Sequence, residues 1–270
     1  MFEKAGYKGV ANNFYDNFLV IKADEETHVD FLATAIAAAG CPDGPVLEAK
    51  YLFPSTTVDS FLALDSVLEG VGVSAYLGAA ADIMDKDYLT AAGSILTIES
   101  RHSAYIRSNI KETPFPAPFD TPLDFNEVFT MAGAFITGFD PEDKASAALS
   151  KKLKAFPALM VAPQKDVYTS SSTVKFVGGI GNIIIANSPA AVITRDTTIY
   201  AAFFSGIEGP YLSKAMPTGN GNFEVVGVPP KAMGQVYVAL TTEKNATLVG
   251  DANIVAGPTV LEVGPETPSK

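Results

Sequence analysis

Residues 25–28 read Glu-Glu-Thr-His and residues 99–102 read Glu-Ser-Arg-His, so the chain carries the pattern Glu-x-x-His twice. Side chains three residues apart lie on the same face of an α-helix. His28 and His102 are the only histidines of the chain. The pattern therefore predicts two helices that each present one carboxylate and one imidazole on a common face.

Each motif interrupts a helical stripe that is otherwise apolar. The residues of the two stripes are Phe14, Phe18, Ile21, Leu32, Ala35 and Ala39 in the first, and Tyr88, Ala92, Ile95, Ile106 and Ile110 in the second. Burial of a carboxylate in a hydrophobic core is costly unless a partner compensates for its charge. Two interruptions of the same chemistry predict a shared partner, and a metal ion is the simplest one.

A third carboxylate, Glu69, lies in a helical pattern over residues 58–80 among apolar neighbours, so it is also expected to point inward. Helical bundles with a dinuclear carboxylate site use Glu-x-x-His on two helices and a single Glu on each of two others. The sequence supplies three of these four helices. Iron or manganese suits such oxygen and imidazole donors. The predicted metal ligands are Glu25, His28, Glu69, Glu99 and His102.

The alternative interpretation of these groups is a buried network of hydrogen bonds and ion pairs without a metal. Asp24, Glu26 and Asp30 fall on the opposite helix face and are expected to face solvent. Asp65 lies one turn before the Glu of the third helix and is interpreted as a surface or loop-facing acid, with a role as a replacement ligand as the lesser alternative. Tyr76 is expected to pack in the core.

The composition limits the classes of function. A net charge of −11 argues against binding to nucleic acid or to an anionic membrane, because either would need a basic face. No apolar run reaches the roughly 20 residues of a membrane-spanning helix, and no signal peptide is visible. Cys41 is the only cysteine and cannot form an internal disulfide. Both histidines are assigned to the motifs, so Ser-His-Asp catalysis is not expected.

The chain divides into a helical part and a strand-rich part. We predict an α+β protein with an antiparallel helical bundle at residues 1–140, a linker at 141–157 and an Ig-like antiparallel β-sandwich at 158–270. Residues 219–222, Gly-Asn-Gly-Asn, are predicted to form a hairpin turn. The expected strands are 159–161, 173–177, 182–186, 191–194, 199–204, 223–228, 235–241 and 259–263.

Several sequence blocks, spread over nearly the whole chain, resemble one family. These blocks are residues 2–7, 23–29, 68–79, 98–102, 114–122, 234–237 and 255–258. They are similar to the ferritin-like domain proteins of the fungal stress-response and plant desiccation-related family. The resemblance implies a ferritin-like antiparallel bundle, a secreted, extracellular protein, and a first bundle helix that carries a further Glu ligand.

This sequence departs from the family because it begins where the loop after the family's first helix would lie. Without that helix the apolar stripes would be exposed, so we expect self-association or a subunit that supplies the missing helix. The expected function is that of a stress-related protein with a di-iron or di-manganese site, intact or degenerate, and any activity would be of the oxidase or peroxide-handling type. The alternatives are a non-catalytic structural or interaction protein that self-associates through the bundle or the sandwich and, more weakly, a carbohydrate binder.

Overall fold

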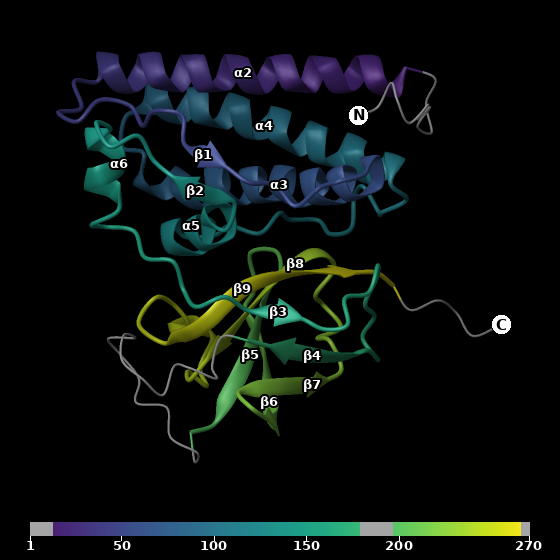
Figure 1. The fold of residues 1–270 in the computed structure, drawn as a ribbon. Coiled ribbons are helices and arrows are strands. Elements are labelled where there is room, and N and C mark those ends of the chain that lie inside the picture. Colours follow the sequence, from purple (N-terminus) through teal and green to yellow (C-terminus); the bar gives the residue numbers. More distant parts are fainter. Residues whose placement is uncertain (1–12, 179–196, 266–270) are drawn as a thin grey trace.

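A layer of helices packs on a curved antiparallel sheet in the computed structural model, which describes residues 13–178 and 197–265 (Figure 1). Three long helices, α2 (Phe14–Ala38), α3 (Val58–Ala79) and α4 (Lys86–Asn109), form most of the helical layer. Helix α3 lies between the other two long helices and the sheet (Figure 1). The three helices that were predicted to carry the metal ligands are therefore neighbours.

Local sequence fixes where α3 and α4 begin. The Thr57 hydroxyl accepts a hydrogen bond from the Ser60 backbone N–H, and the Ser60 hydroxyl accepts one from the Thr57 N–H. At α4 the Asp85 carboxylate accepts hydrogen bonds from the backbone N–H groups of Asp87 and Tyr88. Each such cap stabilises its helix by about 1 kcal/mol.

Short elements connect the long helices and cover their ends. Strand β1 (Lys50–Tyr51) lies in the crossover between α2 and α3 and pairs antiparallel with β2 (Ile136–Gly138). Helix α5 (Phe125–Gly133) immediately precedes β2 in the chain. The remaining short helices are η1 (Ala80–Asp82), α6 (Lys144–Leu149) and η2 (Ala246–Leu248).

The described residues of the strand-rich part form one seven-stranded antiparallel sheet with the order β3-β4-β7-β6-β5-β8-β9. Strand β6 pairs with β5 through residues 211–215 and with β7 through residues 216–219, so it joins both halves of the sheet. The edge strands β3 and β9 are in contact, and the Gly257 N–H donates a hydrogen bond to the Pro157 carbonyl (2.9 Å). The sheet is thus nearly a closed barrel, and the Ig-like sandwich is not confirmed. The strands are β3 (Met160–Val161), β4 (Thr173–Val177), β5 (Ile199–Phe204), β6 (Tyr211–Gly219), β7 (Asn222–Val226), β8 (Gly234–Thr241) and β9 (Ile254–Val263).

Six of the expected strands coincide with observed ones, whereas the segments 182–186 and 191–194 lie outside the described residues. Strand β6 was not expected, because Pro217 and its polar neighbours do not alternate like a strand. The predicted turn at 219–222 joins β6 to β7, with Asn220 at φ +53° and Gly221 at φ +75°. Positive φ at both central residues is the geometry that an Asn-Gly pair favours in tight hairpins.

Hydrogen bonds and apolar contacts anchor α3 to strand β8. The Tyr237 hydroxyl donates to the Gly70 carbonyl (2.9 Å) and lies 2.8 Å from the Ser74 hydroxyl. The Gln235 amide donates to the Val67 carbonyl (3.0 Å). Helical periodicity therefore turns the opposite face of α3 toward α2 and α4. The residues of that opposite face are Asp65, Glu69, Gly72 and Tyr76.

The described residues contain one helical segment, Val58–Asp82, that is long and apolar enough to cross a membrane by length and mean hydropathy alone. The core helix of a folded bundle meets the same criteria. This segment is packed against the sheet and carries Asp65 and Glu69, so we interpret it as the central helix of the bundle.

Candidate metal centre

The side chains of both Glu-x-x-His motifs meet Glu69 between α2, α3 and α4. One ligand atom each from Glu25, Glu69 and His102 lies within 4.8 Å of the other two, and the same holds for Glu25, His28 and Glu99. Because Glu25 belongs to both groups, the two groups adjoin each other. The structure brings all five residues together, and their role as metal ligands stays a prediction.

Each imidazole lies between carboxylates from different helices. His102 Nδ1 is 3.0 Å from Glu25 Oε1 and 3.6 Å from Glu69 Oε2. His28 Nδ1 is 3.3 Å from Glu99 Oε1 and 3.5 Å from Glu25 Oε1. The two motifs are therefore reciprocal, since the histidine of each helix faces the glutamate of the other.

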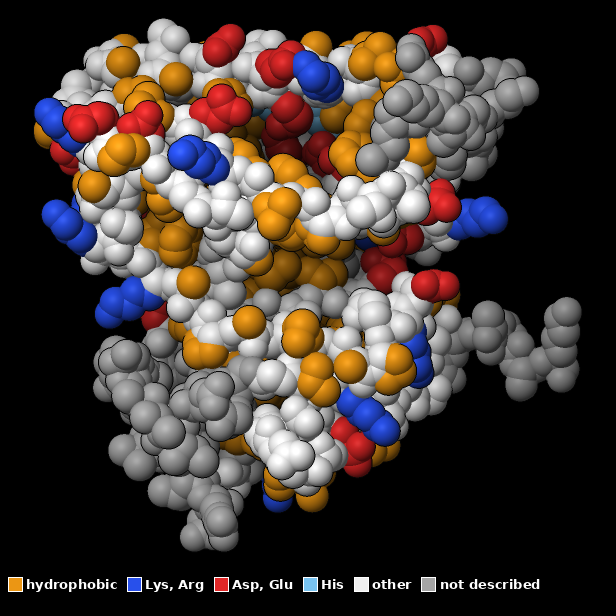
Figure 2. Space-filling view, in the orientation of Figure 1, with side chains coloured by type: hydrophobic (Ala, Val, Ile, Leu, Met, Phe, Trp, Pro, Cys, Tyr) orange, Lys and Arg blue, Asp and Glu red, His pale blue; other side chains and the backbone are white. Residues whose placement is uncertain are grey.

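The site is closed by α3 and α4 and is more open along α2. Glu69, Glu99 and His102 are only 7%, 5% and 7% exposed, whereas the Glu25 side chain is 40% exposed. Figure 2 shows acidic side chains recessed beneath α2, with hydrophobic side chains around them. A small molecule or ion could thus reach the carboxylates from the α2 side.

The donor set fits a bound cation. His28 Nδ1 and Glu69 Oε2 are buried and have no hydrogen-bond partner among the described residues, although Glu99 Oε1 lies 3.3 Å from the first atom and His102 Nδ1 lies 3.6 Å from the second. No Lys or Arg in the described ranges 13–178 and 197–265 forms an ion pair with Glu25, Glu69 or Glu99. Buried carboxylates without a compensating charge are costly, and a metal ion would compensate for them.

Burial and mutual repulsion make the carboxyl groups hold protons when no cation is present. Burial raises the pKa of Glu99 to about 8, and the charges of Glu25 and Glu69 add to this effect. Burial likewise raises the pKa of Glu69. Burial alone would lower the pKa of His102, but its hydrogen bond to Glu25 and the nearby carboxylate of Glu69 outweigh this and raise the pKa to about 10. A metal ion would have to displace these protons.

A glycine allows Glu99 to approach α3 closely. A Cβ atom at Gly72 would lie 2.6 Å from Glu99 Oε2, so close that the Glu99 carboxylate would have to move. Further along the same helix, a Cβ at Gly78 would lie 1.8 Å from the Leu123 carbonyl oxygen. The glycines that follow Glu69 in the sequence therefore serve close packing on both sides of α3.

Asp65 is the site acid whose placement was misjudged from the sequence. It was interpreted as a surface or loop-facing acid, and this is wrong, because its Oδ2 atom is buried and has no hydrogen-bond partner among the described residues. Burial raises the pKa of Asp65 to about 7, and the charges of Glu69 and Glu25 contribute further. The spacing of four residues between Asp65 and Glu69 was the available signal, since it places both on one helix face.

Asp24 is partly exposed to solvent, as expected, with 43% of its side chain accessible. Its assignment to the face opposite the motif is wrong, because its Oδ2 atom lies 3.3 Å from His102 Nε2. The reason is that His102 reaches across from α4 and contacts two consecutive residues of α2. Glu26, which pairs with Lys22, and Asp30 are exposed as expected.

The helical part of the chain is similar to a known protein family. The family model described as a ferritin-like domain matches residues 2–112. This segment holds α2, α3 and α4, and therefore all of the side chains at the candidate metal centre. No curated protein is similar enough to the chain to count as a relative. The helical part of the chain, residues 2–112, is therefore similar to a ferritin-like domain.

Proposed function

We propose that the ferritin-like domain binds a dinuclear centre of iron or manganese through Glu25, His28, Glu69, Glu99 and His102. The observation that carries this proposal is that two groups of three donors share Glu25. Ferritin-like bundles build dinuclear centres from this combination of helix-borne carboxylates and histidines. Oxygen and imidazole donors suit iron and manganese better than they suit softer metals.

In this proposal Glu69 and His102 hold one ion, His28 and Glu99 hold the other, and Glu25 lies between them. Nδ1 of His102 faces the carboxylates, so its Nε2–H donates to Asp24 on the other side of the ring. A carboxylate on the second ring nitrogen of a metal-binding histidine fixes its tautomer and orientation.

In this proposal Asp65 adds a carboxylate beside the centre from α3. Its buried, unpaired oxygen lies one helical turn from Glu69 and on the same face of the helix. Its charge would help to attract a cation to the neighbouring ligands.

A pair of iron or manganese ions, when bound, supplies electron transfer to dioxygen or peroxide, so the proposed activity is of the oxidase or peroxide-handling type. The chain contributes the surroundings of that chemistry. Tyr76 lies beside Glu99 and Glu25, and burial together with these charges raises its pKa to about 12, so its hydroxyl keeps its proton at neutral pH. The more exposed Glu25 marks the side from which small molecules would enter.

Metal analysis of the purified protein tests the proposal. After incubation with Fe²⁺ or Mn²⁺ and gel filtration, we expect bound metal in the wild type and its loss when His28 and His102 are both replaced by Ala. Glu26→Gln is the matched control, because Glu26 belongs to the same motif but is exposed and pairs with Lys22. Absence of iron and manganese from the reconstituted wild type would contradict the proposal.

A second candidate function is that of a non-catalytic interaction protein. It is favoured by exposed apolar side chains along α2, namely Leu19, Val20 and Val29. Self-association, or a subunit that supplies a further helix, would cover them. Light scattering separates the two functions. If the protein is an interaction protein, the double variant Val20→Glu/Val29→Glu should no longer assemble. Replacement of both histidines by Ala should then lower stability without changing the metal content.

Membership in the fungal stress-response and plant desiccation-related family, and secretion, are also part of this proposal. Their support is the set of sequence blocks that resemble that family, including the Glu69 block at residues 68–79. The cellular fraction in which the native protein accumulates tests secretion. Recovery from the culture medium or cell wall is expected, and exclusive recovery from the cytosol would contradict it.

A further inference from the structure

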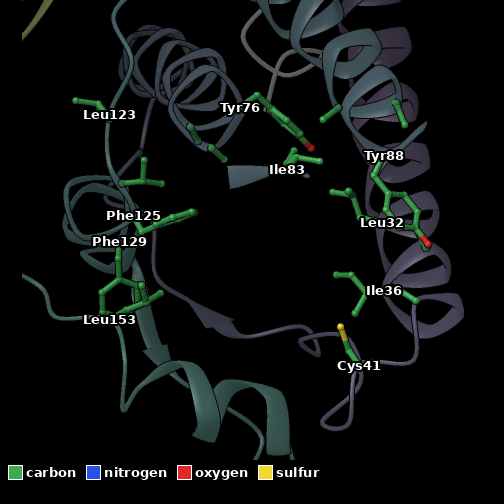
Figure 3. A pocket seen from close by; sticks show the side chains of 18 of the residues that line it. Leu32, Ile36, Cys41, Tyr76, Ile83, Tyr88, Leu123, Phe125, Phe129 and Leu153 are labelled. Carbon is green, nitrogen blue, oxygen red and sulfur yellow. The ribbon is translucent and has the colours of Figure 1, made fainter. Parts of the chain in front are cut away.

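A large apolar cavity lies beside the candidate metal centre. Its volume is about 610 Å³, and its walls come from α2, α3, α4, α5 and the segment that follows α6. Figure 3 shows Phe125 and Phe129 on one side of the cavity and Leu32 and Ile36 on the other, with open space between them. Ligand sites in proteins have volumes of roughly 300–1,000 Å³ and are mostly apolar.

The lining of the cavity selects against charged ligands. Among the described residues, no Lys, Arg or His lines it, and Asp124 is the only acid that does. The Asp124 carboxylate is already engaged, because it accepts the hydrogen bond of the Glu127 backbone N–H at the start of α5. A ligand carboxylate or phosphate would therefore be desolvated without a cationic partner, which is costly. An uncharged ligand avoids this cost.

The cavity adjoins the metal centre through Tyr76 and Phe31. Tyr76 lines the cavity, and its hydroxyl lies close enough to Glu99 and Glu25 for their charges to act on it. Phe31 also lines the cavity, one turn of α2 beyond His28, and both residues border a smaller adjoining pocket. One end of a molecule in the cavity would thus face the carboxylates.

We propose that this cavity binds an uncharged molecule with a long hydrocarbon chain, such as a fatty alcohol, with one end directed at the metal centre. The volume, the apolar walls and the absence of basic lining residues support this class of ligand. The position of the ligand relative to the metal rests on the proposed function, whereas binding in the cavity does not.

Displacement of a neutral fluorescent probe tests the ligand class on the metal-free protein. N-phenyl-1-naphthylamine should bind saturably, and 1-dodecanol should displace it at a concentration at least about tenfold lower than dodecanoate, because burial of an unpaired carboxylate is costly. Equal or better displacement by dodecanoate, or absence of saturable probe binding, would overturn the proposal.

Substitutions that fill the cavity locate the binding. Ala35→Phe on α2 and Ala92→Phe on α4 should each weaken probe binding at least about tenfold, since added side-chain volume occupies the cavity. Ala37→Phe is the matched control, because Ala37 is exposed on α2 and does not line the cavity. Helix content from circular dichroism identifies a variant that misfolds. Unchanged binding in both folded variants would place the probe elsewhere and overturn the proposal.

Light scattering tests whether a second copy of the chain occupies the cavity instead of a small molecule. The oligomeric state should be the same with and without saturating 1-dodecanol and in Ala35→Phe. A wild-type dimer that Ala35→Phe abolishes, together with absence of probe binding, would assign the cavity to a partner copy.

Paramagnetic broadening separates this inference from the proposed function. With Mn²⁺ bound, the proton resonances at one end of 1-dodecanol should broaden, and they should stay sharp with Zn²⁺. If Mn²⁺ does not bind, the metal proposal fails. Displacement of the fluorescent probe by 1-dodecanol still tests ligand binding in the cavity. If Mn²⁺ binds to the motif residues and no broadening occurs, the proposed position of the ligand is wrong.

Discussion

Asp65 places a buried, unpaired carboxylate oxygen one helical turn from Glu69. Its replacement by Asn keeps the shape of the side chain but removes a negative charge beside Glu69. We expect the affinity for Mn²⁺ to fall by about 10–100-fold, the range seen when groups that support metal ligands are removed. Isothermal titration calorimetry at constant pH measures this affinity.

The matched control for Asp65 is Asp59→Asn. Asp59 lies on the same helix but is exposed, so its replacement should leave the affinity for Mn²⁺ within about twofold of the wild type. Equal affinities in the two variants would show that Asp65 does not contribute to the centre.

Residue-level prediction from the sequence succeeded where the pattern is local. The spacing of Glu25 and His28 fixes a common helix face whatever the rest of the chain does. The same spacing argument was available for Asp65, which lies four residues before Glu69, but the inward direction of that face is fixed only by the packing of the opposite face of α3 against Tyr237 of β8. The contact of the partly exposed Asp24 with His102 could not be predicted either, since His102 belongs to another helix.

At the scale of elements, the contact between α3 and α4 depends on Gly72. Gly72→Ala would place a Cβ atom 2.6 Å from the Glu99 carboxylate and push that ligand away from the centre. Metal affinity should fall by at least about tenfold even though Ala favours a helix by roughly 0.5–1 kcal/mol over Gly.

Gly93→Ala on α4 provides the matched comparison for Gly72. A Cβ atom at Gly93 would meet no atom within 4 Å, so only the helix preference of Ala applies there. We expect this variant to gain about 0.5–1 kcal/mol in the free energy of unfolding and to keep its metal affinity. Urea unfolding and calorimetry measure both quantities, and a similar loss of affinity in the two glycine variants would contradict a specific role for Gly72.

The junction between the helices and the sheet predicts a coupling between Tyr237 and α3. Tyr237→Phe removes the hydrogen bond to the Gly70 carbonyl and the contact with the Ser74 hydroxyl, leaving buried polar groups unpaired. The free energy of unfolding should fall by about 1–3 kcal/mol. Urea denaturation tests this, and a change below about 0.5 kcal/mol would show that the junction is not anchored there.

The elements themselves were predicted unevenly from the sequence. The long helices were predicted from their apolar periodicity, which is a local signal. Strand β6 was missed because Pro217 and its polar neighbours give no alternating signal, and the strand is specified by its partners β5 and β7. The near-closure of the sheet depends on contacts between β3 and β9, which are far apart in the sequence.

At the scale of the whole molecule, the charges of the centre link stability to pH. Asp65 and Glu99 have pKa values of about 7 and about 8 in the folded chain, against 3.8 and 4.5 as ordinary values. The folded state therefore binds more protons than the unfolded state between pH 4 and 8, and its stability falls as the pH rises through this window. His102 extends the fall, since its pKa rises from 6.5 to about 10.

Thermal unfolding of the metal-free and metal-loaded proteins tests this linkage. The Tm of the metal-free protein should decrease from about pH 5 to about pH 9, and the increase in Tm caused by Mn²⁺ should become larger over the same range, because metal binding requires deprotonated ligands. A Tm of the metal-free protein that is constant or rises across this range would contradict the assigned protonation of the centre.

Anomalous X-ray diffraction from crystals grown with Mn²⁺ is the most direct test of the dinuclear centre. The account predicts two anomalous peaks between α2, α3 and α4, one beside Glu69 and His102 and one beside His28 and Glu99, with Glu25 adjoining both. Data collected at the manganese edge that show no peak among these side chains, in crystals of protein saturated with Mn²⁺, would contradict it.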